Sequence, residues 1–219
     1  MMKSRTLGIL ISILFCSLGI APGSPARSSE INRPTSQPYT GNLSTFENAK
    51  RAKNLQIDRV MDLLGIQAGS VVADIGAGGG WFSVRAARRV GPRGIVYAED
   101  INPPYVKEIM ARARREKLPN IRAILGKPDD PQLPAMSVNA VLFLKAYHEI
   151  AHPIVLLRHV RAALRPEGRL GIIDRNGNGA NHGVDPNDVM QELRRAGFFF
   201  VAKYDFVKAD GEDYFLIFR

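Results

Sequence analysis

The stretch that decides the fold is Asp74-Ile75-Gly76-Ala77-Gly78-Gly79-Gly80. A short apolar run, residues 70–75, leads into it, and residues 81–90 continue from it as an expected helix. Glycines let a backbone turn sharply and let a ligand press closely against it. In an open parallel sheet, ligands bind at the carboxyl ends of the strands, and the first amides of a following helix face the same place. The stretch therefore predicts a ligand-binding loop between a strand and a helix.

Outward from this loop, apolar runs alternate with segments of helical periodicity through the first five expected strands. Strands are expected at residues 70–75, 95–98, 121–125, 138–144, 169–173, 198–207 and 214–218, and helices at 44–64, 81–90, 103–117, 153–164 and 185–196. Continuous apolar runs are typical of strands that are covered on both faces of a parallel sheet. The last two strands are separated by a short turn, Ala209-Asp210-Gly211, which allows only an antiparallel hairpin. The predicted class is α/β, a doubly wound, mostly parallel seven-stranded sheet with a C-terminal antiparallel hairpin.

Two side chains, Asp74 and Trp81, indicate whether the loop binds a dinucleotide or a cationic ligand. A dinucleotide fold uses G-x-G-x-x-G, but the third glycine position holds Trp81. Asp74 would repel a diphosphate and would suit a cationic ligand, such as an ammonium or sulfonium. Asp100, at the end of the second strand, would accept hydrogen bonds from the ribose of either ligand.

Ser44 and Glu47 form a capping-box pattern at the start of the first expected helix.

The complete Asp-x-Gly-x-Gly-x-Gly motif of residues 74–80, followed in order by Asp100, resembles the class I S-adenosylmethionine-dependent methyltransferases. The resemblance covers roughly residues 45–219 and implies a Rossmann-like methyltransferase fold with S-adenosyl-L-methionine as cofactor. The implied cofactor site comprises Asp74, Gly76, Ala77, Gly78, Gly80, Asp100, Ile101 and Asp129, with Asp129 preferred over Asp130 as the adenine-contacting acid. Asn139 stands where the family often has Asp, at a position that mostly supports local structure.

Candidate catalytic residues follow the fourth strand, where the chain reads Lys145-Ala146-Tyr147-His148-Glu149. Methyl transfer needs a positioned nucleophile and sometimes a base. We expect His148 to be the base, Tyr147 to line the methyl site and Glu149 to orient His148. The alternative is that His148 and Glu149 only hydrogen-bond loop backbone around the cofactor. The expected reaction is methyl transfer to a small molecule, and the alternative is an accessory protein that binds S-adenosylmethionine or a nucleoside without turnover.

Two further motifs and one glycine-rich loop of the sequence bear on the function. His148-Glu149-Ile150-Ala151-His152 matches the zinc metallopeptidase pattern, which needs both histidines on one helix. Pro153 disfavours helical geometry at His152, so a peptidase is a remote alternative and no metal is expected. Asn102-Pro103-Pro104-Tyr105 resembles an amino-group methyltransferase motif but follows the wrong strand, and more simply starts a helix. The glycine-rich residues 176–183 either lie over the substrate or are a flexible connection.

The composition limits the classes of binding partner that are expected. The 219-residue chain has a net charge of +9, yet no run of Lys and Arg exceeds a pair, and aromatic residues are not interleaved with basic ones. Nucleic acid is therefore not expected as a partner, and a small-molecule substrate is. The single cysteine, Cys16, leaves the folded part without disulfides.

The N-terminal residues predict a targeting segment. Lys3 and Arg5 precede the uncharged residues 7–20, and small residues follow, as in a signal peptide. We expect residues 1–26 to be a signal peptide or an uncleaved anchor, 27–43 a flexible linker, and 44–219 the methyltransferase domain. The expected location is the periplasm or the cell envelope, with a membrane-anchored protein as the alternative, and membrane contact only through an uncleaved N-terminal segment.

Overall fold

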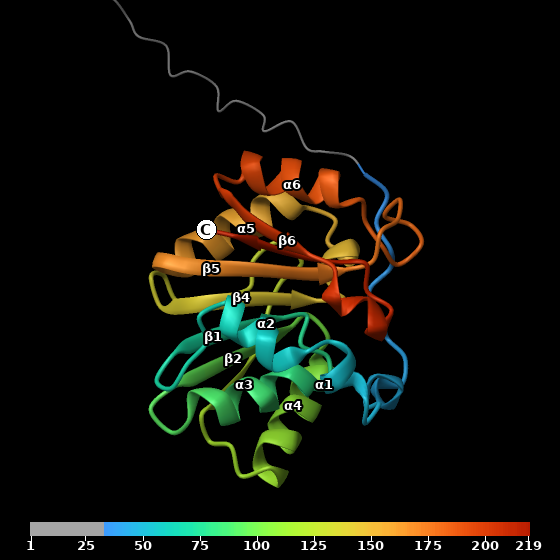
Figure 1. The fold of residues 1–219 in the computed structure, drawn as a ribbon. Coiled ribbons are helices and arrows are strands. Elements are labelled where there is room, and N and C mark those ends of the chain that lie inside the picture. Colours follow the sequence, from blue (N-terminus) through green and yellow to red (C-terminus); the bar gives the residue numbers. More distant parts are fainter. Residues whose placement is uncertain (1–32) are drawn as a thin grey trace, which may run out of the picture.

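Seven strands form one sheet in the order β3-β2-β1-β4-β5-β7-β6 (Figure 1) in the computed structural model, which describes residues 33–219. The strands are β1 (Val71–Ile75), β2 (Ile95–Asp100), β3 (Ile121–Leu125), β4 (Val138–Leu144), β5 (Leu164–Asp174), β6 (Phe200–Tyr204) and β7 (Tyr214–Phe218). Each neighbouring pair from β3 to β5 is parallel, whereas β7 is antiparallel to both β5 and β6. The predicted mostly parallel seven-stranded sheet with a C-terminal antiparallel hairpin is confirmed.

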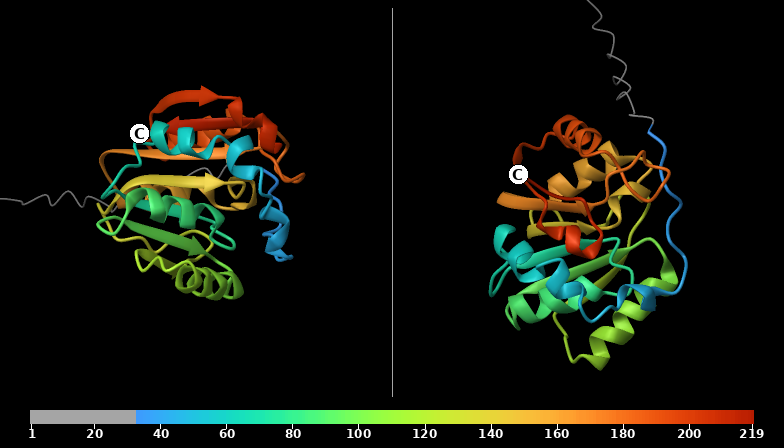
Figure 2. Two further views of the ribbon diagram at one scale, coloured as in Figure 1. Left: turned by 60° about the horizontal axis from the view of Figure 1, so that its bottom comes forward. Right: turned by 45° about the vertical axis from the view of Figure 1, so that its right-hand side comes forward.

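Helices cover both faces of this sheet (Figures 1 and 2). They are α1 (Arg51–Asn54), α2 (Ile57–Leu63), α3 (Trp81–Val90), α4 (Pro103–Arg115), α5 (Pro153–Ala163) and α6 (Pro186–Arg195), with short 3-10 helices η1 (Leu43–Phe46), η2 (Tyr147–Glu149) and η3 (Phe206–Asp210). One apolar core joins the sheet to α5 and α6, and a second joins it to α2 and α3. Alternate residues of β4 enter the two cores, with Phe143 in the first and Leu142 in the second. This explains the continuous apolar runs, because both faces of each central strand are buried.

Asn139 links the two central strands at the end opposite the glycine loop. Its side-chain oxygen accepts a hydrogen bond of 2.9 Å from the backbone nitrogen of Val71, so it joins β4 to the start of β1. The expectation that this position supports local structure is confirmed, since an amide oxygen makes the same bond that a carboxylate would.

The prediction of a single helix at residues 44–64 is wrong. The segment forms η1, α1 and α2, with Gln56 in a left-handed conformation (φ 48°) between the two α-helices. Asn42, not Ser44, caps the first piece, and the Glu47 side chain pairs with Arg112 of α4 instead of closing a capping box. Tertiary contacts outweigh local helical preference here. Arg51 in particular is buried against Asp210, at 3.4 Å, and lies over the Trp81 ring.

Other elements differ from expectation mainly in length. β5 begins at Leu164, directly after α5, rather than at residue 169, and β6 is confined to Phe200–Tyr204 because η3 occupies part of the connection to β7. The alternation of strands and helices is interrupted once within residues 33–219. Residues 126–137 join β3 to β4 without a helix and contain an isolated bridge between Lys127 and Asp130.

Residues 33–47 form an N-terminal strap across the carboxyl edge of the sheet, the edge at which the arrowheads of β4 and β5 point (Figure 1). At one end, Arg33 forms an ion pair of 2.7 Å with Glu192 of α6, and both side chains are almost fully buried. At the other end, Glu47 pairs with Arg112 of α4, and Tyr105 of the same helix donates to the Gly41 carbonyl. The described part of the expected linker, residues 33–43, is therefore packed on the domain, because its polar groups have partners there.

The expected signal peptide or anchor, residues 1–26, lies outside the described residues and stays a prediction. Within residues 33–219, none of the helices has both the length and the apolar character needed to cross a bilayer.

Candidate functional site

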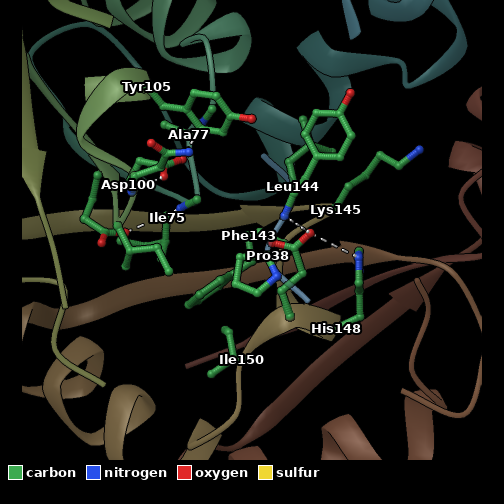
Figure 3. Close-up of a pocket in the computed structure, with 18 of the residues that line it drawn as sticks. Pro38, Ile75, Ala77, Asp100, Tyr105, Phe143, Leu144, Lys145, His148 and Ile150 are labelled. Carbon is green, nitrogen blue, oxygen red and sulfur yellow. Dashed lines mark hydrogen bonds and ion pairs between the residues drawn. The ribbon is translucent and has the colours of Figure 1, made fainter. Parts of the chain in front are cut away.

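A cavity of about 890 Å³ opens at the carboxyl ends of β1, β2 and β4, beneath the N-terminal strap. This volume lies toward the upper end of the range for small-molecule sites, roughly 300–1,000 Å³. Ala77 and Asp100 lie on one side of the cavity and Lys145 and His148 on the other, with Pro38 of the strap between them (Figure 3). The cavity is therefore long enough to have two chemically different ends.

The glycine loop forms the first end. Gly76 has φ +68°, and a Cβ added to it would lie 2.5 Å from the Ala146 side chain, so a larger residue would be strained and would also collide with the loop after β4. Gly80 (φ +75°) turns the chain into α3, whose first amides face the same region. Leu43 of the strap lies over Gly78 and Gly79. The backbone is thus bare on the cavity side and covered from above.

Three carboxyl groups surround this loop: Asp74, Glu99 and Asp100, all nearly buried and all in the cavity wall. Asp100 accepts hydrogen bonds of 2.8 Å from the backbone nitrogens of Gly78 and Asn102. Burial raises the pKa of Asp74 to about 7, although Ser83 donates to it at 2.6 Å, and burial with the nearby Asp100 raises the pKa of Glu99 to about 8. Burial also raises the pKa of Asp100. A cationic ligand would relieve this crowding, and a diphosphate would worsen it.

Trp81 occupies the position at which a dinucleotide-binding motif has its third glycine. It begins α3, is almost fully buried and lines the cavity. The guanidinium groups of Arg51 and Arg85 lie over its ring at 4.4 and 3.8 Å from the centroid. Such cation–π contacts hold the indole in place, so the start of α3 presents an aromatic wall rather than the close backbone approach that a diphosphate uses.

The expected cofactor residues fall mostly in this wall. Asp74, Gly76, Ala77, Gly78, Asp100 and Ile101 line the cavity, and Gly80 shapes the loop behind it. After β3, however, the lining comes from Lys127 and Pro128, while Asp129 points to the exposed surface. The structure therefore does not bring Asp129 together with the other predicted cofactor residues.

His148 lies at the other end of the cavity and is held by Asp174. The Nδ1 atom of His148 lies 2.8 and 3.0 Å from the two carboxylate oxygens of Asp174, and the His148 backbone nitrogen donates to the same carboxylate at 3.1 Å. Because a carboxylate only accepts, Nδ1 carries a proton, and in the neutral tautomer of the ring Nε2 presents a lone pair. Asp174, at the end of β5 and fully buried, is the orienting acid.

Glu149 has a different role from the expected one. Its Oε1 lies 3.8 Å from Nε2 of His148, too far for a hydrogen bond, and accepts from the backbone nitrogen of Tyr39 in the strap at 3.1 Å. Burial raises the pKa of Glu149 to about 7, and the nearby His148 lowers it in part. Glu149 therefore faces His148 across a gap and is fixed by the strap, while Asp174 sets the histidine ring.

Tyr147 lies away from the position expected for it. It is fully buried beside Phe143, outside the cavity lining, and its hydroxyl donates to Glu192 at 2.7 Å. Burial, with the adjacent Glu192, raises the pKa of Tyr147 well above its ordinary value. In the structure its place is in the core, where it supports the ion pair between Arg33 and Glu192.

The zinc-peptidase pattern does not form its helix. His148 and Glu149 lie in the short 3-10 helix η2, whereas His152 precedes α5 with φ −120°. Asn102 and Pro103 start α4, as expected. Neither motif therefore has the geometry that its usual chemistry needs.

Several residues at the site were missed by the sequence reasoning. Asp174 and Glu99 are acids at the carboxyl ends of strands, a signal that could have marked both. His182 lies in the glycine-rich loop, which was considered as a possible cover, and its ring meets His148 in an edge-to-face contact with centroids 5.7 Å apart. Ser36 was assigned to the linker and left no signal, since its contact with the loop depends on the folded strap.

The sheet order, the glycine loop at the switch between β1 and β4, and the acids around it define a class I S-adenosylmethionine-dependent methyltransferase domain. The model of a family described as a methyltransferase domain matches residues 72–168. Residues 72–168 therefore match this methyltransferase family, and S-adenosyl-L-methionine, the predicted cofactor, is the cofactor of such methyltransferases.

Named proteins agree with this assignment. Nocamycin O-methyltransferase of Saccharothrix syringae is 36% identical over 117 residues, which cover 52% of this chain and 41% of that protein. An S-adenosylmethionine-dependent methyltransferase from Aquifex aeolicus has a TM-score of 0.73 at 20% identity, covering 80% of this chain and 95% of that one. Fibrillarin of Aeropyrum pernix, solved with bound S-adenosyl-L-methionine, has a TM-score of 0.60 at 15% identity, covering 77% and 74%. The chain spans less than half the length of the curated relatives it matches.

Proposed function

We propose that this protein transfers the methyl group of S-adenosylmethionine to an oxygen of a small acceptor, a hydroxyl or an enol. The observation that carries the proposal is the two-ended cavity. One end has a bare glycine loop and three carboxyl groups for a cationic nucleoside, and the other end has His148 with its Nε2 directed away from Asp174. The similarity to an O-methyltransferase supports an oxygen acceptor.

The reaction needs little from the protein beyond position. The sulfonium supplies the reactivity, so the chain must hold the acceptor in line with the methyl group and exclude water. The N-terminal strap contributes Pro38 and Tyr39 to the cavity wall, and Pro38 lies between the two ends (Figure 3). Ile150 and Phe143 line the region between the two ends and suit the apolar part of an acceptor. A cavity of about 890 Å³ suits a small-molecule acceptor beside the cofactor.

Turnover is tested by the formation of S-adenosylhomocysteine. The full chain is incubated with S-adenosylmethionine and a panel of small phenols, enols and aliphatic alcohols, and the product is measured by mass spectrometry. We expect S-adenosylhomocysteine and a methylated acceptor in equal amounts with at least one class. An exposed-site variant, Lys208→Ala, serves as the control, since this lysine lies outside the cavity lining and pairs with the exposed Asp205 at 3.1 Å. Tight cofactor binding with no product from any acceptor, or from a metabolite extract, would favour a binding protein without turnover.

A further inference from the structure

Three groups that can bind a metal ion meet at the acceptor end of the cavity. His148, Glu149 and His182 each offer one ligand atom, and these three atoms all lie within 4.8 Å of one another. All three residues line the cavity. They come from two segments, η2 after β4 and the glycine-rich loop after β5, which the parallel sheet brings to the same edge.

The contact with Asp174 prepares His148 for a ligand role. A histidine that binds a metal almost always donates its other ring nitrogen to a carboxylate or a carbonyl, which fixes the ring and its tautomer. Here Nδ1 of His148 is 2.8 Å from the fully buried Asp174, so in the neutral ring Nε2 is the nitrogen that offers a lone pair. That lone pair faces Oε1 of Glu149 at 3.8 Å. Two acceptors that face each other across a gap are best satisfied by a cation between them.

His182 completes the set from an exposed loop. Its backbone nitrogen donates to the hydroxyl of Ser36 at 2.9 Å, and that buried hydroxyl donates to the Gly179 carbonyl at 2.8 Å. His182 itself has a left-handed backbone conformation, φ 56°. The strap therefore holds the loop in the conformation that brings the His182 ring edge-to-face with that of His148.

We propose that His148, Glu149 and His182 bind a divalent transition-metal ion of the zinc or iron(II) type. Two imidazoles and one carboxylate are a donor set for such ions, and they leave at least one coordination position open. Metal–ligand bonds of about 2.0–2.2 Å place ligand atoms about 3.4 Å apart. Side-chain movements of about 1 Å bring the three atoms to that spacing, and the exposed His182 is free to make them. This proposal departs from the sequence-based expectation of no metal.

An ion held by these three residues would keep at least one coordination position for the acceptor and would activate it; this step rests on the proposed methyl transfer. An acceptor hydroxyl bound to the ion loses its proton to water more readily, since a Lewis acid stabilises the resulting oxyanion. A lone pair of that oxygen then forms the bond to the methyl carbon. The sulfur–methyl bond breaks with its electron pair retained by sulfur, which gives neutral S-adenosylhomocysteine. In this arrangement His148 is a ligand and not the general base.

Metal binding is tested without turnover. The full chain is stripped with a chelator, dialysed, and titrated with Co²⁺ while visible absorption is recorded, and with Zn²⁺ by calorimetry. We expect one ion per chain and the absorption bands of protein-bound Co²⁺. An orienting carboxylate is worth 10–100-fold in affinity, so His182→Ala, which removes a ligand, should weaken binding at least about 100-fold. His159 of α5 is exposed and lies 3.8 Å from Asp130; its variant, His159→Ala, is the control and should leave metal affinity unchanged.

The outcomes separate this proposal from the proposed function. The metal site is overturned if the wild type binds no metal, or if the wild type and His182→Ala bind it with equal affinity. This holds even if S-adenosylmethionine still binds. Metal binding with the expected loss in His182→Ala, but without S-adenosylmethionine binding, leaves the site standing and overturns methyl transfer. Since His182 is exposed, its variant should keep the wild-type melting temperature, which excludes misfolding as the cause of a lost site. Asp174→Asn should give an intermediate loss.

Discussion

At the scale of single residues, the arrangement of acids decides which nucleotide the loop accepts. Asp74, Glu99 and Asp100 crowd negative charge around a glycine loop, whereas a diphosphate site offers only amides and basic groups there. Burial resists ionisation of all three. A sulfonium placed beside them would restore their charge, so selectivity comes from electrostatics as well as from the shape of the loop.

Asp100→Ala should weaken S-adenosylmethionine binding by about 10–100-fold, because a hydrogen bond to a charged group is worth about 1.5–3 kcal/mol. Isothermal titration calorimetry measures the change. Asp129→Ala is the matched comparison, and since Asp129 lies outside the cavity lining, it should bind the cofactor as the wild type does. Equal affinities for wild type and Asp100→Ala would remove Asp100 from the cofactor site.

The raised pKa values predict a pH dependence of stability in the absence of ligand. A carboxyl group whose pKa is higher in the folded chain holds its proton more tightly there, so its stabilisation is complete below the unfolded value of about 4. It is lost as the pH rises through about 7 for Asp74 and about 8 for Glu99. The melting temperature should therefore fall between pH 5 and pH 8. Asp74→Asn should flatten this slope, and an unchanged slope in differential scanning calorimetry would contradict the assignment.

At the scale of elements, the N-terminal strap is the feature that joins the two faces of the sheet. It is anchored on α6 through Arg33 and on α4 through Glu47, and between these anchors it covers the glycine loop and contacts Glu149. The same strap holds the glycine-rich loop through Ser36. The cofactor end and the acceptor end of the cavity thus share one covering segment.

Arg33→Ala should lower the free energy of unfolding by about 3–5 kcal/mol, since it leaves the fully buried Glu192 without its cation. Urea denaturation followed by circular dichroism measures this. Lys208→Ala, at an exposed ion pair with Asp205, should leave the value unchanged within experimental error. Similar small losses in both variants would mean that the strap is not anchored through this pair.

The sequence predicted the elements whose pattern is local and missed contacts between distant segments. The glycine loop, the central strands and the C-terminal hairpin follow from apolar runs and turn residues, which act over a few positions. The breaks in residues 44–64 depend on Arg51 reaching Trp81 and Asp210, which no local pattern encodes. His148 was found from its place after β4, but its partner Asp174 is 26 positions away and meets it only because β4 and β5 are neighbours.

At the scale of the whole molecule, the parallel sheet places every chemical group of the site at one edge. β1 and β2 end in the cofactor acids, while β4 and β5 lead into the residues of the acceptor end, and the order β3-β2-β1-β4-β5 sets these two groups side by side. The strap then closes the edge from outside. The fold therefore explains why one cavity has two chemically distinct ends.

Calorimetric titration of the full chain with S-adenosylmethionine, and separately with a nicotinamide dinucleotide, tests this account most directly. We predict that one equivalent of S-adenosylmethionine binds with measurable heat and that the dinucleotide does not bind. Uptake of the dinucleotide by a protein that ignores S-adenosylmethionine would contradict the account.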